Sequence, residues 1–255
     1  MSNIIDAITN WWNGFTEEFA RVFIEDDRWT WLVDGLVETL KITAGALLIG
    51  IFIGLIVSAV RSSYDKNGDE LKKTKPFLFA ILRFFNGICK LYLTVIRGTP
   101  CVVQLLICYF VIFVSAKDGL PVAIFAFGMN SGAYVAEIFR GGIMSIDDGQ
   151  FEAGRSLGLN YVKTMIYIII PQVFKVILPT LCNEFIVLLK ETSVAGYIGM
   201  VDLTKAGDKI RGRTFSAFMP LIAVALIYLV LVVVLTWLVG KLERRLRKNE
   251  RRHSH

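Results

Sequence analysis

Polar residues inside long apolar runs are the candidates for chemistry in this 255-residue chain. Asn183 and Glu184 lie in the apolar run 171–189, and Glu137 lies near the end of another run. A charged side chain at the centre of a bilayer costs about 2.5–3.5 kcal/mol on insertion scales, so such residues call for an explanation. Asn183 and Glu184 could hold the ammonium and other polar groups of a solute. Glu137 and Arg97 are further candidates for its path.

Each of these residues also has a purely structural explanation. Asn183 and Glu184 could form hydrogen bonds or a salt bridge between helices, and this alternative stays open. Glu137 precedes Arg140 by three residues, which is the spacing of an ion pair on one helix face. Arg97 could anchor its helix at the membrane surface through its long apolar stem.

Most catalytic chemistries lack their usual residues. The four cysteines lie in apolar stretches without Cys-x-x-Cys spacing, and both histidines, His253 and His255, are in the tail. A histidine-based triad or metal site is therefore not expected. The segment 158–164 lacks the second glycine that a phosphate loop has before its lysine. We expect no enzymatic activity, no metal and no cofactor in this chain.

The elements that carry these residues are predicted to be membrane helices. The chain is 55% hydrophobic and 20% charged, with a mean hydropathy of +0.57, which is high for a water-soluble domain. We predict an all-α membrane protein with five transmembrane helices that cross a hydrocarbon core ~30 Å thick. Their predicted spans are residues 35–60, 101–115, 120–139, 171–189 and 215–239.

Three segments outside these spans have their own predictions. Residues 77–96 carry Arg83, Lys90 and Arg97 at seven-residue intervals, which predicts a helix at or entering the inner interface. The stretch 190–214 is predicted to face outside. Residues 1–34 begin acidic and place aromatic residues at mostly helical spacing, so an interfacial helix is predicted rather than a signal peptide.

Basic residues predict the orientation. The polar loop 61–75 and the tail 241–255 are rich in lysine and arginine, which the positive-inside rule assigns to the cytoplasm. The N-terminus then lies outside and the C-terminus inside. Basic residues within 205–213 oppose this rule and are outweighed. Because the tail flanks an apolar run rather than a folded aromatic surface, no nucleic-acid partner is expected.

The segment after the third span carries a pattern that could transmit force. Glu152, Ala153, Gly154 and Gly158 are followed by Ile168-Ile169-Ile170-Pro171. Small residues would let a partner approach the helix backbone, and a glutamate at the helix start would complement the helix dipole. We predict a helix from Glu152 to Ile170, ended by Pro171, with a bend or close contact at Gly158. An ordinary amphipathic connector is the alternative.

This pattern resembles the EAA signature of ABC-importer permeases. The flanking segments resemble the polar amino acid branch of that family, in order and spacing, at 97–100, 133–142, 150–152, 183–185 and 189–193. The resemblance covers about residues 35–240 and implies a permease domain there, between the N-terminal interfacial segment predicted at 1–34 and the basic cytoplasmic tail predicted at 241–255. It implies a cytoplasmic coupling helix at about 150–170, with these residues in the coupling role: Glu152, Ala153, Gly154, Gly158 and Pro171.

The resemblance also implies a function and partners. The expected protein is a bacterial inner-membrane permease subunit that moves polar amino acids by alternating access within membrane lipid. Its expected partners are a cytoplasmic ABC ATPase dimer, an extracytoplasmic solute-binding protein and a second permease chain, either identical or a paralogue. A channel or ion-coupled transporter would show inverted repeats, and a membrane enzyme or sensor anchor would show a soluble catalytic domain. The motifs do not specify which amino acid is carried.

Overall fold

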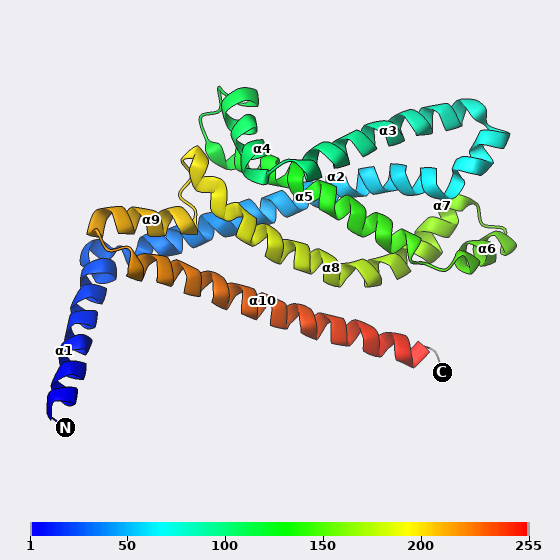
Figure 1. Ribbon diagram of the computed structural model, residues 1–255. Coiled ribbons are helices and arrows are strands. Elements are labelled where there is room, and N and C mark those ends of the chain that lie inside the picture. Colours follow the sequence, from blue (N-terminus) through cyan, green and yellow to red (C-terminus); the bar gives the residue numbers. More distant parts are fainter. Residues whose placement is uncertain (1, 254–255) are drawn as a thin grey trace.

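The computed structural model is a bundle of long helices, and the predicted all-α fold is confirmed (Figure 1). The structure describes the backbone of residues 2–253 and the side chains of residue 6 and residues 9–246, and every regular element in this range is helical. The α-helices are α1 Ser2–Phe19, α2 Trp29–Thr74, α3 Pro76–Gly98, α4 Cys101–Ile107, α5 Gly119–Met144, α6 Asp148–Ser156, α7 Tyr161–Thr164, α8 Ile170–Glu191, α9 Leu203–Thr214 and α10 Phe218–His253.

Within the part of the chain that the structure describes, five helical segments are long and apolar enough to cross a membrane, as the sequence predicted. They are α2, α3, α5, the nearly continuous helix Tyr161–Ile198 that contains α7 and α8, and the stretch Phe218–Leu246 of α10. The last two lie beside each other, and α2 packs along α5. The number of spans is therefore right, although the second one is a different segment from the one predicted.

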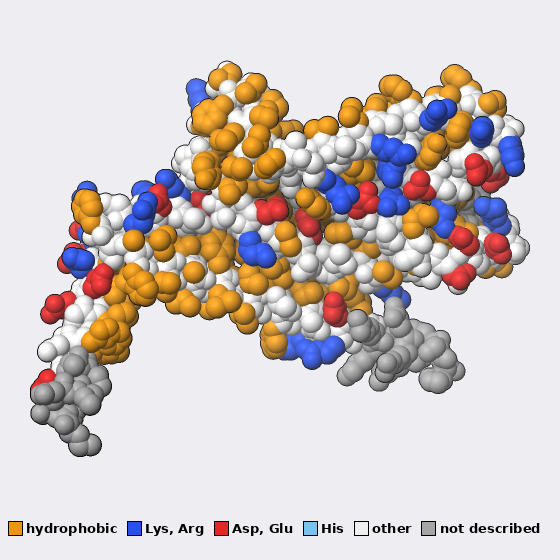
Figure 2. Space-filling model, viewed as in Figure 1, with side chains coloured by type: hydrophobic (Ala, Val, Ile, Leu, Met, Phe, Trp, Pro, Cys, Tyr) orange, Lys and Arg blue, Asp and Glu red, His pale blue; other side chains and the backbone are white. Residues whose placement is uncertain are grey.

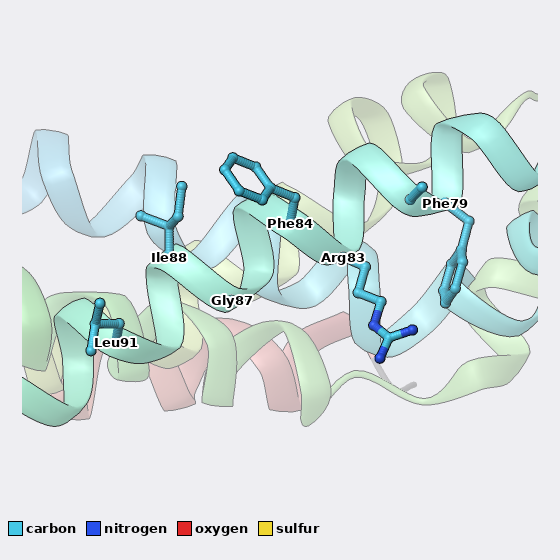
Figure 3. A pocket seen from close by; sticks show the side chains of 7 residues that line it. Phe79, Arg83, Phe84, Gly87, Ile88 and Leu91 are labelled. Atoms are coloured by element: carbon cyan, nitrogen blue, oxygen red, sulfur yellow. The ribbon is translucent and has the colours of Figure 1, made fainter.

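The second span is α3, and the predicted span 101–115 is wrong. Cys101–Ile112 forms α4 and a π-helical turn. Its twelve residues extend only ~18 Å, which is less than the thickness of the hydrocarbon core of a bilayer. Helix α3 is long enough to cross a membrane. Its charges lie on one side, which leaves the other side apolar. Figure 3 shows Phe84 and Ile88 projecting away from the side on which Arg83 lies.

The predicted loop 61–75 is also wrong, because α2 continues as a helix to Thr74. The 46 residues of α2 extend ~69 Å, so one end of this helix projects well beyond a bilayer. Polar contacts hold this projecting end. Arg61 donates to Asn86 of α3 at 3.2 Å, and Asp65 pairs with Arg140 of α5 at 3.5 Å. Tertiary partners therefore keep a charged segment helical.

The most extensive contact in the bundle is the crossing of α2 and α5. A Cβ added at Gly54 would lie 2.5 Å from a methyl carbon of Val135 and 3.0 Å from the backbone nitrogen of Ala136. A Cβ added at Gly128 would lie 2.7 Å from Ile49. Glycine thus lets the two backbones approach closely, which is how membrane helices gain packing without a hydrophobic driving force.

Helix α9 is pinned to α2 at the opposite end of the bundle. The fully buried Asp202 caps α9 by accepting from the Thr204 backbone N–H at 2.9 Å. The backbone N–H of Leu203, between these two residues, donates to Thr39 Oγ1 of α2 at 3.0 Å. Burial raises the pKa of Asp202 above its ordinary value near 3.8.

Helix α1 leaves this end of the bundle steeply (Figure 1). Its base is held where Ser216 Oγ donates to Glu18 at 2.7 Å. Along its length Trp11, Trp12 and Phe15 are exposed with their rings stacked or tilted together. Figure 2 shows a hydrophobic side of α1 that faces the direction of α10. Such a helix suits a membrane surface, and the interfacial role stays a prediction.

Replacing Gly54 by leucine should destabilise the bundle, because the new side chain would enter the α2–α5 contact. Overpacking of this kind costs about 1–3 kcal/mol. The midpoint of thermal unfolding in detergent should fall for Gly54→Leu. Gly240→Leu is the matched control, since nothing lies within 4 Å of a Cβ at Gly240. Equal midpoints for both variants would show that the crossing does not need glycine.

Asp202→Asn should raise stability increasingly as pH rises, whereas Asp202→Ala should lower it. A carboxyl whose pKa is raised by folding binds protons more tightly in the folded state, so stability falls as pH climbs from about 3.9 through the raised folded pKa. Asparagine keeps the capping oxygen without the charge, and alanine loses a cap worth about 1 kcal/mol. Unfolding midpoints across this pH range test it; a constant difference between Asp202→Asn and the native chain would contradict it.

Candidate functional site

Helix α6 is the short helix predicted to transmit force, and it begins at Asp148. Asp147 caps it by accepting from the Gly149 backbone N–H at 2.6 Å. The predicted start at Glu152 is therefore wrong by four residues, and the acidic group at the positive end of the dipole is Asp148. Lys66 of α2 pairs with Asp148, which ties the start of α6 to the bundle.

One face of α6 is packed against its own chain. Phe151 is buried with its ring 4.9 Å from the Lys66 ammonium. Gly154, one turn on, is buried too, and a Cβ there would lie 2.6 Å from a methyl carbon of Thr164. The expected open approach at Gly154 is therefore taken up by α7. Because of this contact, α6 and α7 should move together.

The other face of α6 is open. Glu152, Ala153, Arg155 and Ser156 are exposed, and Leu157 just beyond the helix has 76% of its surface exposed. This face is therefore open to a partner, and Leu157 is the large apolar side chain that it offers. Sequence reasoning missed Leu157, although its position between Ser156 and Gly158 at a helix end was the available signal.

Gly158 ends α6 in a bend, as predicted. Its φ of +74° lies in the left-handed region that favours glycine. Its N–H donates to the Arg155 carbonyl at 2.9 Å, and the N–H of Leu159 donates to the Gly154 carbonyl at 3.0 Å. These two bonds form a Schellman motif. The predicted continuous helix 152–170 is therefore interrupted here.

Pro171 does not end a helix, which corrects the prediction. It lies in the first turn of α8, directly after a π-helical turn at Met165–Ile169. Proline is tolerated in a first turn because its missing N–H has no partner to lose there. The chain therefore runs as one nearly continuous rod from Tyr161 to Ile198 and links α6 mechanically to the membrane interior.

The predicted path residues Arg97 and Glu137 come together near this end of the bundle. Glu137 lies 3.8 Å from Arg97 and accepts from Arg140 at 2.9 Å, so the predicted pair on one helix face is present as well. Arg97 and Glu137 line an open pocket of about 600 Å³ together with Arg61, Lys90 and Tyr134. The pocket offers more positive than negative groups.

Glu184 and Asn183 are not brought together. Glu184 is half-buried and accepts from Ser131 Oγ of α5 at 3.0 Å, which is the predicted inter-helix hydrogen bond. Asn183 is exposed. Neighbours on a helix project about 100° apart, so the two side chains serve different faces of α8. Glu184 thus lies inside the bundle, where a partly buried carboxylate could meet a cation.

Buried Asn130 and partly buried Gln104 form an amide pair at the break between α3 and α4. The Gln104 side chain donates to the Ile96 carbonyl at 2.7 Å and to the Thr99 carbonyl at 3.1 Å. Asn130 of α5 in turn donates to Gln104 at 3.0 Å. Backbone groups freed by a break within a membrane must find partners in the protein. Sequence reasoning did not identify this pair, whose members lie 26 residues apart.

Comparison with known proteins decides the family. Residues 77–248 match the family of binding-protein-dependent transport system inner membrane components. The chain belongs to this family. It is a multi-pass permease of the inner membrane, and its relatives are transport subunits rather than enzymes. Among the described residues, no group of three or more His, Cys, Asp or Glu side chains could hold a metal ion.

Similar proteins come from several bacteria. The permease is 36% identical over 230 residues to the arginine transport system permease protein ArtQ of Bacillus subtilis, covering 86% of this chain and 94% of ArtQ. It is 34% identical over 220 residues to the glutamine transport system permease protein GlnP of Escherichia coli K12, covering 85% and 93%. A crystal structure of an amino acid ABC transporter with histidines matches with a TM-score of 0.73 at 38% identity, covering 88% and 98%.

Glu184→Gln tests whether this carboxylate contacts the solute. Glutamine keeps an oxygen for Ser131 but removes the charge, so a solute cation would lose a charged hydrogen bond and the KM of uptake should rise about tenfold. Ser131→Ala is the control, because it removes the hydrogen bond and leaves the charge. A normal KM in Glu184→Gln together with lowered stability in Ser131→Ala would assign Glu184 a structural role.

Proposed function

We propose that this permease carries polar amino acids into the bacterial cell as part of an ATP-binding cassette importer. The names of its relatives, which carry arginine, cystine or glutamine, support an amino acid as substrate. The 38% identity to a crystallised amino acid transporter supports the same class. The proposed complex contains a cytoplasmic ATPase dimer, a second permease chain and an extracytoplasmic solute-binding protein.

The proposed orientation places the N-terminus outside and the C-terminus in the cytoplasm. Figure 2 shows lysine and arginine gathered over α3 and the far end of α2, the end that also carries α6. The basic stretch 241–246 of α10 belongs to the same end in Figure 1. The positive-inside rule assigns such an end to the cytoplasm. Helix α6 would then face the ATPase, and α1 would lie at the outer membrane surface.

The packing of α6 supports its role as the coupling helix, and this observation carries the proposal. Its buried face is locked to α7 through Gly154 and Thr164, whereas its open face presents Glu152, Ala153 and Leu157. A partner that pushes on the open face would therefore move α7 and the rod Tyr161–Ile198 behind it. Pro171 and Gly158 serve this coupling by shaping the joints rather than by touching the ATPase.

The same rod carries the proposed contact for the amino acid. Glu184 lies on α8, so a shift of α6 would be transmitted to its carboxylate and to the Ser131 hydrogen bond. Arg97 and Glu137 line the pocket nearer the cytoplasmic end and would meet the solute on its way out. Asn183 could meet the same solute only if the second permease chain brings its face of α8 to the path.

Leu157→Asp should uncouple the permease from its ATPase. An aspartate here would bring an unpaired charge into a contact that now takes an apolar side chain, which should weaken binding about tenfold or more. Association is measured by copurification of the ATPase from membranes, and function by ATP-dependent amino acid uptake. Both should fall for Leu157→Asp, while insertion into the membrane stays normal.

Tyr197→Asp is the matched control for ATPase association, because Tyr197 is similarly exposed at the opposite end of the bundle. Copurification should survive this change. If Leu157→Asp also keeps its ATPase and its uptake, α6 is a connector. If uptake proceeds without any ATPase, a channel or an ion-coupled transporter replaces the proposal.

A further inference from the structure

An apolar groove of about 680 Å³ runs between α8 and α10, and no coupling or path residue named above lies in it. Its floor is formed by α2 and by Phe139 of α5. The groove exists because α10 diverges from the start of α8 toward its own C-terminal end (Figure 1). Leu178 and Leu181 of α8 face Leu238 and Leu242 of α10 across it.

The dimensions of the groove suit one hydrocarbon chain. The lining residues of α8 extend from 170 to 186 and those of α10 from 235 to 242. At 1.5 Å per residue these walls are ~24 Å and ~10 Å long. One wall is longer and the other shorter than the ~15 Å depth of one leaflet. The volume lies within the usual 300–1,000 Å³ range of small-molecule sites.

A groove open to the hydrocarbon region is filled either by lipid or by protein. Lipid tails are as apolar as leucine, so an acyl chain gains little by transfer alone, and selectivity has to come from a headgroup. The charges at the open end of the groove therefore decide which lipid it prefers.

Both walls of the groove end in an aromatic residue followed by a basic one. On α10, Trp237 lies under the ammonium of Lys241 at 3.4 Å, and Arg245 lies one turn beyond Leu242 on the same helix face. On the other wall, exposed Tyr167 and Lys163 precede the lining residue Ile170 at helical spacing. Among the described side chains of α10 from 235 to 246, the acidic one is Glu243, which is half-buried. Aromatic and basic side chains in this order are typical of the headgroup level.

We propose that this groove is a binding site for an anionic phospholipid, with one acyl chain between α8 and α10 and its headgroup level with the basic ends of the two walls, which carry Lys163 and Arg245. The site rests on the proposed orientation only in being assigned to the cytoplasmic leaflet. Charge complementarity favours this occupant over a helix of a second permease chain, because a neutral apolar helix would leave the basic residues without a counterion. The lipid would brace α10 against the rod that carries Glu184.

The test uses the assembled transporter in nanodiscs made from equal amounts of phosphatidylglycerol and phosphatidylcholine, followed by mass spectrometry of the lipid that stays bound after detergent extraction. We expect retained phosphatidylglycerol in excess of phosphatidylcholine. Leu178→Trp fills the groove and should abolish retention, whereas Val176→Trp, on the same helix but outside the groove, should not.

Charge variants test the headgroup. Lys163→Gln and Arg245→Gln should each lower the preference for phosphatidylglycerol about fivefold, since a basic residue near a membrane surface contributes on that scale. Arg213→Gln, exposed at the opposite end, is the control and should leave the preference unchanged. Equal retention of both lipids by the native transporter, or unchanged retention in Leu178→Trp, would overturn the proposal.

A photo-reactive residue at position 178 identifies the occupant directly. An adduct with the mass of a phospholipid supports the site, and an adduct with a second permease chain overturns it in favour of a protein interface. Retention and cross-linking are measured without transport. A negative result for the lipid site would therefore not contradict the proposal of amino acid import. Absence of amino acid uptake would equally not contradict a positive result for lipid binding.

Discussion

The close crossing of α2 and α5 is the constraint on which the rest of the permease depends. Gly54 and Gly128 bring the two backbones so near that even a methyl group would collide with the partner helix. A bilayer gives membrane helices no hydrophobic reason to associate, so this dense packing has to supply the attraction. It also sets the direction of α5, whose other faces present Ser131 to α8 and Glu137 to α3.

Three polar side chains of α5 each contact a different neighbouring helix. Asn130 reaches Gln104 at the α3–α4 break, Ser131 reaches Glu184, and Arg140 reaches Asp65 of α2. Because an unpaired polar group is costly in a membrane, these contacts place the neighbouring helices around α5. A helix that organises the bundle in this way gives the moving parts a fixed reference.

In the proposed coupling, the α6–α7 corner and the rod that follows it would be the moving parts. Gly154 allows α6 to seat directly on Thr164, and Gly158 permits the turn that folds α6 back. A corner packed this closely would transmit displacement with little loss, since packed elements shift as units. Helix α10 contacts the same rod along part of its length and then diverges, which leaves the groove assigned here to lipid.

Local features of the sequence were enough to predict much of this architecture. Hydropathy gave the number of spans, and a bend or close contact at Gly158 was predicted from residue type, where the structure has a left-handed bend. The charges of α3 misled the prediction of the second span, because periodicity shows that charges share a face but not whether the other face meets lipid. Pro171 was misread as a helix end for a related reason: a proline signals the first turn of a helix as readily as a stop.

By itself, the sequence determined an all-helical membrane permease, its likeness to a family and the positions of the motif proposed for coupling. The tertiary structure alone decided that Glu184 turns inward while Asn183 turns out, that Gly154 serves α7 rather than a partner, and that Gln104 meets Asn130. The physical reason is range. Hydropathy and backbone preference act over a few residues, whereas each of these decisions depends on which distant helix comes to lie beside the residue.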